Sequence, residues 1–179
     1  SNTTANNNTA VGRASLALNT TGDNNTAIGE NSLVNNTTAD NNTAMGYGAL
    51  GACATGAENV AIGVNAGAQV TGDRGVFIGK GACPNATSSS KGVAIGHDAG
   101  SNLTTADDYV IIGDSACASG AMTGADNVAI GKNAGYDLTS GDSNTCLGQD
   151  SGGSISTGSN NQCIGHNAGG ANSPSGQIT

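Results

Sequence analysis

Aromatic, charged and especially basic residues are scarce in this sequence of 179 residues. Aromatic residues make up 2% of the chain, tryptophan is absent and charged residues account for 10%. Five lysines and arginines stand against 13 aspartates and glutamates, which gives a net charge of −8. A nucleic-acid-binding protein needs a basic surface, so this class is excluded, and the acidic excess is typical of a solvated surface. No apolar run approaches the ~18 residues of a membrane-spanning helix, and we expect no membrane insertion of this segment.

A 17-residue repeat organises the chain. It is marked by a glycine that follows an aliphatic residue, and these glycines keep the period except for one interval that is shorter by one and one that is longer by one. A regular period of this length is typical of a solenoid. We predict one repeat domain over residues 1–179, with coils centred on Gly12, Gly29, Gly46, Gly63, Gly79, Gly96, Gly113, Gly131, Gly148 and Gly165. Because the pattern reaches both ends, we expect a fragment of a longer fibre.

The residues before each repeat glycine predict a short strand. The residue directly before it is always Val, Ile, Leu or Met, and the residue three before it is Thr or Val in all coils but one. These two positions share a strand face, because side chains alternate. A repeat of this length is too short for a strand, a helix and two turns. We therefore predict an all-β fold, a parallel β-solenoid of about ten 17-residue coils with strands stacked ~4.8 Å apart.

The middle residue of each predicted strand is apolar as well, and it is usually alanine. A strand that is apolar on both faces is expected to be covered on both. We predict that the aliphatic residues fill the coil and that the middle residues face a common axis between copies of the chain. The predicted trimer-axis column is Ala27, Ala44, Ala61, Phe77, Ala94, Ile111, Ala129, Cys146 and Cys163.

Corner positions are also conspicuous in the repeat. Asn, Gly and Asp dominate the positions four before and two after the repeat glycine, and these residues tolerate a left-handed backbone. Tyr109 is an exception at the first position, and we expect it in a locally different turn. The position three after the glycine is always Ala or Ser, which predicts a narrow coil.

The segments "NNTAIGENSL" (residues 24–33) and "NVAIGVNAG" (residues 59–67) resemble the head repeats of trimeric autotransporter adhesins. Similar repeats occur in phage and viral tail-fibre proteins, and "TGSNNQCIGHNAG" (residues 157–169) is closer to those. The 17-residue period also favours the fibre proteins. The resemblance covers nearly the whole chain. It implies a left-handed β-roll, a homotrimer and an exposed adhesive role, and it carries over no catalytic residue.

Few residues suggest chemistry. The five cysteines lack the paired spacing of a metal site, and only Cys146 and Cys163, in adjacent coils, come within disulfide reach; buried free thiols are the preferred interpretation. Asp23, Asp40, Asp73, Asp107 and Asp142 could bind Ca²⁺, but they skip coils, and a turn-forming role is favoured. We predict no catalytic residue, cofactor or metal.

The position directly after the repeat glycine varies freely and is expected to face solvent. We predict a possible surface-contact stripe there, made of Arg13, Glu30, Tyr47, Lys80, His97, Asp114, Lys132, Gln149 and His166.

The function predicted from the sequence is structural and adhesive. It is that of a segment of a homotrimeric, extracellular fibre on a cell surface or virion, which contacts a host receptor or glycan. Two alternatives stay open. An ice-binding solenoid would use the threonines Thr9, Thr26 and Thr43, although this position becomes valine at Val60. A polysaccharide depolymerase on a β-helix would require catalysis near His97 and Asp98.

Overall fold

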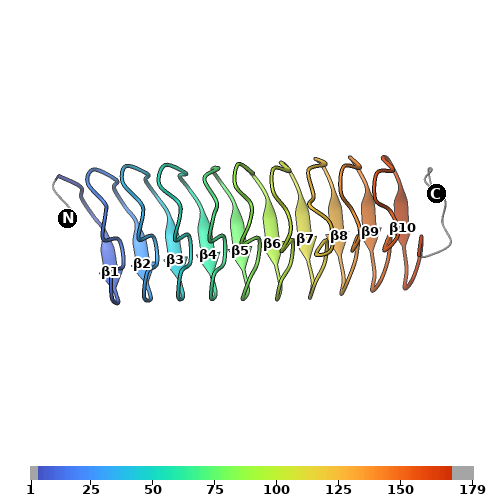
Figure 1. Cartoon of the computed structure of the whole chain (residues 1–179), viewed down its shortest axis with the longest axis horizontal. Coiled ribbons are helices and arrows are strands. Elements are labelled where there is room, and N and C mark those ends of the chain that lie inside the picture. The colour runs from blue at the N-terminus through green and yellow to red at the C-terminus, as the bar shows by residue number, and fades with distance from the viewer. Residues whose placement is uncertain (1–3, 171–179) are drawn as a thin grey trace.

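Ten short parallel strands form a single sheet that runs the length of a rod (Figure 1). The computed structural model describes residues 4–170, so residues 1–3 and 171–179 of the predicted domain lie outside the described part. The strands pair in chain order and are β1 (Thr9–Val11), β2 (Thr26–Ile28), β3 (Thr43–Met45), β4 (Val60–Ile62), β5 (Val76–Ile78), β6 (Val93–Ile95), β7 (Val110–Ile112), β8 (Val128–Ile130), β9 (Thr145–Leu147) and β10 (Gln162–Ile164). The predicted parallel β-solenoid is confirmed, with ten strands that delimit nine complete coils. Within residues 4–170, no helix has the length and apolar character needed to cross a membrane.

Strand register is constant along the rod even where the repeat length changes. In the shortened interval Ala61 still pairs with Phe77, and in the lengthened interval Ile111 pairs with Ala129. The extra and missing residues therefore lie in the loops, where an insertion or deletion is tolerated best. The sheet keeps the register because a slip by one residue would exchange its inner and outer faces.

The repeat glycines form the tightest contact between coils. Their φ angles lie between 121° and 143°, a backbone region that is essentially restricted to glycine. A Cβ atom on Gly63 would lie 2.6 Å from both the carbonyl carbon and the oxygen of Gly79. From Gly29 onward, each glycine also donates its N–H to the coil before it, as Gly63 does to the Met45 carbonyl at 2.8 Å. This corner therefore requires glycine in every coil that another coil follows.

The middle residue of each strand points into the coil, so the predicted trimer-axis column was placed on the wrong side. All nine of its members, from Ala27 to Cys163, are at most 1% exposed within a single chain, and sister chains cannot reach them. The aliphatic residues predicted to fill the coil lie outside instead, and Val11, Ile62 and Ile164 are 57%, 38% and 66% exposed. The physical reason is the narrow interior, which admits alanine more readily than isoleucine.

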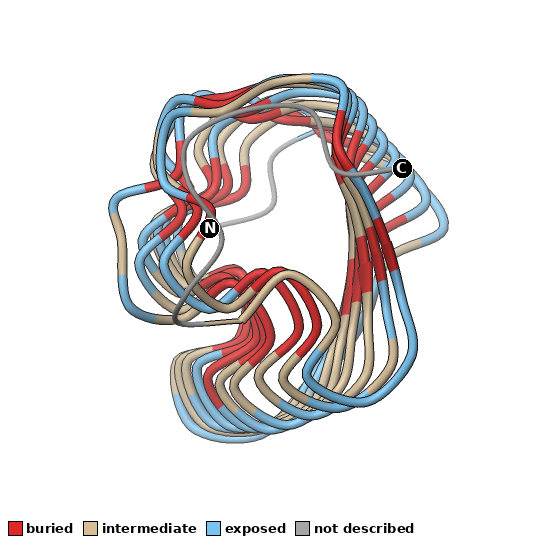
Figure 2. Ribbon diagram, turned by 90° about the vertical axis from the view of Figure 1, so that its right-hand side faces the viewer, coloured by how far each residue is buried: buried red, intermediate tan, exposed pale blue. Residues whose placement is uncertain are grey.

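Buried positions recur at the same places in successive coils (Figure 2). Residues at these positions on neighbouring coils compensate for one another in volume. Two positions can be compared from coil to coil: the residue four after a repeat glycine and the middle strand residue of the next coil. A large residue at one position goes with a small residue at the other in the pairs Leu16–Ala27, Leu33–Ala44, Leu50–Ala61, Gly67–Phe77 and Gly100–Ile111. A Cβ atom on Gly67 would lie 2.8 Å from the Phe77 ring, and one on Gly100 would lie 3.4 Å from the Ile111 Cδ1. This interlocking gives the interior the close packing that folded proteins need.

Asparagines four before the repeat glycine form a buried ladder rather than the predicted left-handed corner. The Asn42 N–H donates to the Asn25 Oδ1 at 2.9 Å, and the Asn42 amide nitrogen donates to the Gly56 carbonyl at 2.8 Å. Asn59 repeats the pattern on Asn42. The left-handed residues sit one position earlier, for example Asn41 with φ 61°. The other predicted corner, two after the glycine, is confirmed, because all ten of its residues have positive φ.

Tyr109 replaces an asparagine of this ladder without changing the turn, so the prediction of a different turn was wrong. Its carbonyl accepts the Val93 N–H at 2.9 Å, as the asparagine carbonyls do in other coils. Its ring is buried, and its hydroxyl lies 3.2 Å from the Ser89 Oγ. Glycine at position 92 makes room, because a Cβ there would lie 2.0 Å from the Tyr109 Cζ.

The corner contact predicts that Gly63→Val destabilises the rod severely. A valine would have to adopt a φ of 136° and place its Cβ against Gly79. We expect a loss of more than ~3 kcal/mol in the free energy of unfolding, or failure to fold. The exposed Lys132→Ser is the control, and its thermal unfolding midpoint should remain that of the wild type. Equal effects of the two substitutions in calorimetry would show that the corner assignment is wrong.

The compensation between Gly67 and Phe77 predicts strong coupling in a double-mutant cycle. Phe77→Ala leaves a cavity and should cost about 3–5 kcal/mol, and Gly67→Leu alone should clash with the Phe77 ring. Together they recreate the Leu33–Ala44 combination, and leucine tolerates this backbone because Leu33 has φ 47°. We expect the double variant to be more stable than the sum of the single losses by at least ~1 kcal/mol in urea denaturation. Additive losses would contradict the proposed packing.

Candidate functional site

The outer strand face is a regular and mostly apolar surface that runs along the rod. It consists of the residues one and three before each repeat glycine, which point away from the coil. Its members are Thr9, Val11, Thr26, Ile28, Thr43, Met45, Val60, Ile62, Val76, Ile78, Val93, Ile95, Val110, Ile112, Val128, Ile130, Thr145, Leu147, Gln162 and Ile164. From β4 to β8 every member is valine or isoleucine, so the centre of the face is wholly aliphatic.

A single chain leaves this face uncovered. All its side chains are intermediate or exposed, whereas the residues between them are buried except in β1. The view along the rod in Figure 2 shows one wall of chain with no second layer over any side of the described part. The face also contains no charged residue, although the chain carries a net charge of −8. An uncharged aliphatic surface of this regularity is unusual on a monomer and indicates an interaction site.

The predicted surface-contact stripe runs along one edge of the outer strand face, directly after the repeat glycines. Its predicted exposure is confirmed, because all its members are exposed except Glu30, which is half-buried. Neighbouring coils form ion pairs along it: Arg13 binds Glu30, and this carboxylate raises the pKa of the Arg13 guanidinium. The stripe is therefore a row of solvated polar groups beside an apolar face.

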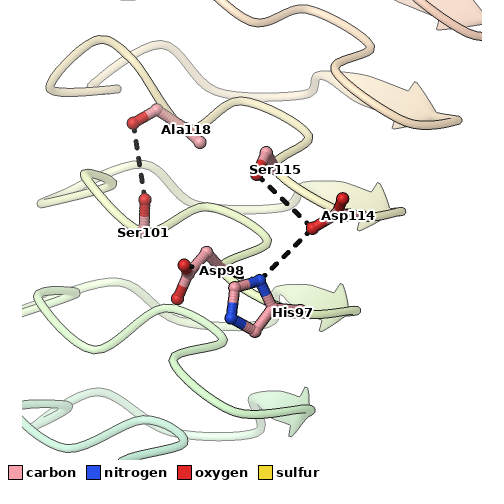
Figure 3. Close-up of polar contacts among 6 residues, drawn as sticks. All are labelled: His97, Asp98, Ser101, Asp114, Ser115 and Ala118. Atoms are coloured by element: carbon pink, nitrogen blue, oxygen red, sulfur yellow. Dashed lines mark hydrogen bonds and ion pairs between the residues drawn. The ribbon is translucent and has the colours of Figure 1, made fainter.

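His97 is the most densely paired residue of the stripe (Figure 3). Its Nδ1 lies 3.3 Å from the Asp114 carboxylate in the next coil and 3.5 Å from the Asp98 carboxylate. The side chains of all three residues are about half exposed. One imidazole thus lies between two acidic side chains at the surface. In the described part of the chain, no group of three or more His, Cys, Asp and Glu side chains is arranged to hold a metal ion.

The five cysteines are all free and buried. Cys146 and Cys163 face each other in the register of β9 and β10, as the sequence predicted. Burial raises the pKa of the Cys53 thiol to about 11 and that of Cys83 to about 12. A thiol must ionise to act as a nucleophile, so the environment of these residues is typical of packing.

The predicted acidic column has a structural role. The Asp40 carboxylate accepts the Asp23 N–H at 2.6 Å, and the Asp142 carboxylate accepts the Ala125 N–H at 2.9 Å. Each of these aspartates thus ties its coil to the preceding one, which agrees with the prediction that they shape turns. Their oxygens are partly used in these bonds rather than directed at a common point.

The sequence failed to identify the outer strand face as a surface. Alternation along a strand shows which residues share a face, but it does not show which face is inside. The signal was available in the invariant small residues three after the repeat glycine, such as Ala49 and Ala66, which are fully buried as predicted. The restriction to Ala or Ser at this buried position indicates a coil with little room for a row of isoleucines.

In comparisons with protein-family models, curated proteins and solved structures, none matched this chain.

Proposed function

We propose that the chain is a structural and adhesive segment of a homotrimeric extracellular fibre, carried on a cell surface or a virion. The observation that carries the proposal is the uncovered outer strand face. In the proposed fibre, the outer strand faces of three chains meet around a common axis, and the residues at the axis are therefore aliphatic rather than the alanines of the predicted trimer-axis column. The surface-contact stripe borders this interface and contacts a receptor or glycan on a host surface.

The dimensions of the outer strand face suit a long, shared interface. Ten strands give nine inter-strand steps of ~4.8 Å, so the face extends about 43 Å. Burial of apolar surface is favourable by roughly 25 cal/mol per Å². Because every coil repeats the same contact, a small gain per coil accumulates along the rod. If the same surface stayed exposed to water, this favourable free energy would not be gained.

A second copy of the same chain is the partner that best fits such a face. A regular ladder of identical spacing is matched by another ladder with that spacing, and soluble oligomers generally close around a symmetry axis. The absence of charge on the face avoids repulsion between acidic chains. The resemblance to adhesin heads and tail fibres favours three copies.

The ice-binding alternative is supported by one observation. Thr9, Thr26 and Thr43 lie side by side on the outer strand face, where water could reach them. The row ends at Val60, and a long aliphatic centre is better suited to a chain partner than to ice. A thermal-hysteresis assay separates the two functions, since the proposed fibre segment should show no activity.

The proposal predicts that Ile62→Glu dissociates the assembly without unfolding the coils. Three glutamates would meet near the axis, where burial of an unpaired charge is costly. In sedimentation velocity the wild type should have three times the 17.1 kDa mass of one chain, and the variant should be monomeric with an unchanged circular dichroism spectrum.

Gln69→Glu is the matched control, because it adds the same charge to an exposed residue seven positions further along the same coil. It should leave the trimer intact. A stable wild-type monomer at micromolar concentration, or equal dissociation by both substitutions, would contradict the proposed interface.

A further inference from the structure

A surface groove lies on the last coils of the rod, and no residue of the outer strand face lines it. Its volume is about 350 Å³. Its lining includes Asn133, Tyr136, Asp150, Gly153, Ser154 and Asn167. These residues come from successive coils, so the groove runs along the rod.

The groove exists because a large side chain in one coil is followed by glycine at the same position of the next two coils. Tyr136 lies five after its repeat glycine, and the same position holds Gly153 and Gly170 in the next two coils. The first seven coils carry no aromatic residue there. A Cβ on Gly153 would have one close neighbour, the Asp150 carbonyl oxygen at 3.3 Å, so the space beside it is open. The exposed Tyr136 ring, at 40%, therefore forms a wall beside a floor of backbone.

Hydrogen-bonding groups also line the groove. Ser115, Asn133, Asp150 and Asn167 occupy the corner two after the repeat glycine in four successive coils, with φ angles of 54–56°. The Asn133 amide nitrogen donates to the Asp150 Oδ1 at 2.9 Å, and this bond lowers the pKa of the Asp150 carboxyl. The donors and acceptors are thus repeated at the ~4.8 Å spacing of the coils.

We propose that this groove binds a neutral oligosaccharide. A sugar ring has an apolar face of C–H groups, which packs on an aromatic ring, and an edge of hydroxyls, which bond to amides and carboxylates. Pockets that fix a small ligand combine these two kinds of group. The coil spacing is also similar to the length of one sugar unit, so consecutive units would meet equivalent corner residues.

The lining argues against other ligand classes. No lysine or arginine is among the lining residues, and Asp150 contributes a negative charge, so phosphates and acidic sugars are disfavoured. Tyr136 is the only large apolar group in the lining, which is insufficient for a lipid chain. The groove uses other positions of the repeat than the surface-contact stripe does, and its binding does not depend on assembly into a trimer.

The test is binding of the full chain to an array of neutral oligosaccharides of glucose, galactose, mannose and N-acetylglucosamine, with acidic oligosaccharides as comparison. The best neutral ligand is then titrated by calorimetry. Tyr136→Ala removes the wall, and Gly153→Val fills the floor with a residue that the repeat accepts at the same position in Val34. Each substitution should weaken binding at least tenfold while the circular dichroism spectrum stays unchanged.

Leu18→Ala is the control, since Leu18 is a similarly exposed large side chain that lies outside both the groove and the surface-contact stripe. It should leave the affinity unchanged. No binding to any neutral oligosaccharide, stronger binding to acidic ones, or unchanged affinity in both groove variants would overturn the proposal. The mass of each sample, measured in parallel by sedimentation, separates this outcome from a failure of the trimer proposal.

Discussion

The close stacking of the repeat glycines is the constraint on which the rest of the structure depends. Between successive coils, a Cβ atom at these corners would lie only 2.3–2.8 Å from the next backbone carbonyl. This contact fixes the coil path and keeps the interior narrow. The interior then accepts a large residue where a small one accompanies it, as Ala44 accompanies Leu33 and Gly67 accompanies Phe77. Buried asparagines bind the backbone where the chain turns, so that few buried polar groups lack a partner.

A narrow interior has a consequence for the outside of the rod. Most of the strand valines and isoleucines, which would be the core of an ordinary sheet, lie on the outer strand face, and Ile111 is an exception inside the coil. A single chain thus keeps an apolar surface that other copies could cover. The inner faces of the three-residue strands stabilise the chain, and the association that we propose would use their outer faces. Such a division of roles would suit a fibre.

Much of this architecture could be predicted from the sequence, because it depends on spacing. The period gave the strands and their register, and the small residues at Ala49 and Ala66 indicated a narrow coil. The prediction exchanged the inner and outer faces of the strand. Which side is inside depends on the space that the coil leaves around residues such as Ala44 and Phe77, and alternation along the strand does not show it. The prediction placed one left-handed corner a residue too late, because asparagine is common both in left-handed turns and in hydrogen-bonded ladders. The groove beside Tyr136 depends on three coils at once, and no single repeat indicates it.

The most direct measurement of the central claim is the distance between equivalent residues in different chains. Spin labels placed on Thr43→Cys and Asn35→Cys can be compared by pulsed electron paramagnetic resonance, because the five native thiols are buried. Thr43 lies on the outer strand face, and Asn35 lies about half a coil away in an exposed loop. We predict a short interchain distance at position 43 and a clearly longer one at position 35. The reverse order, or no interchain coupling at position 43, would contradict assembly through the outer strand face.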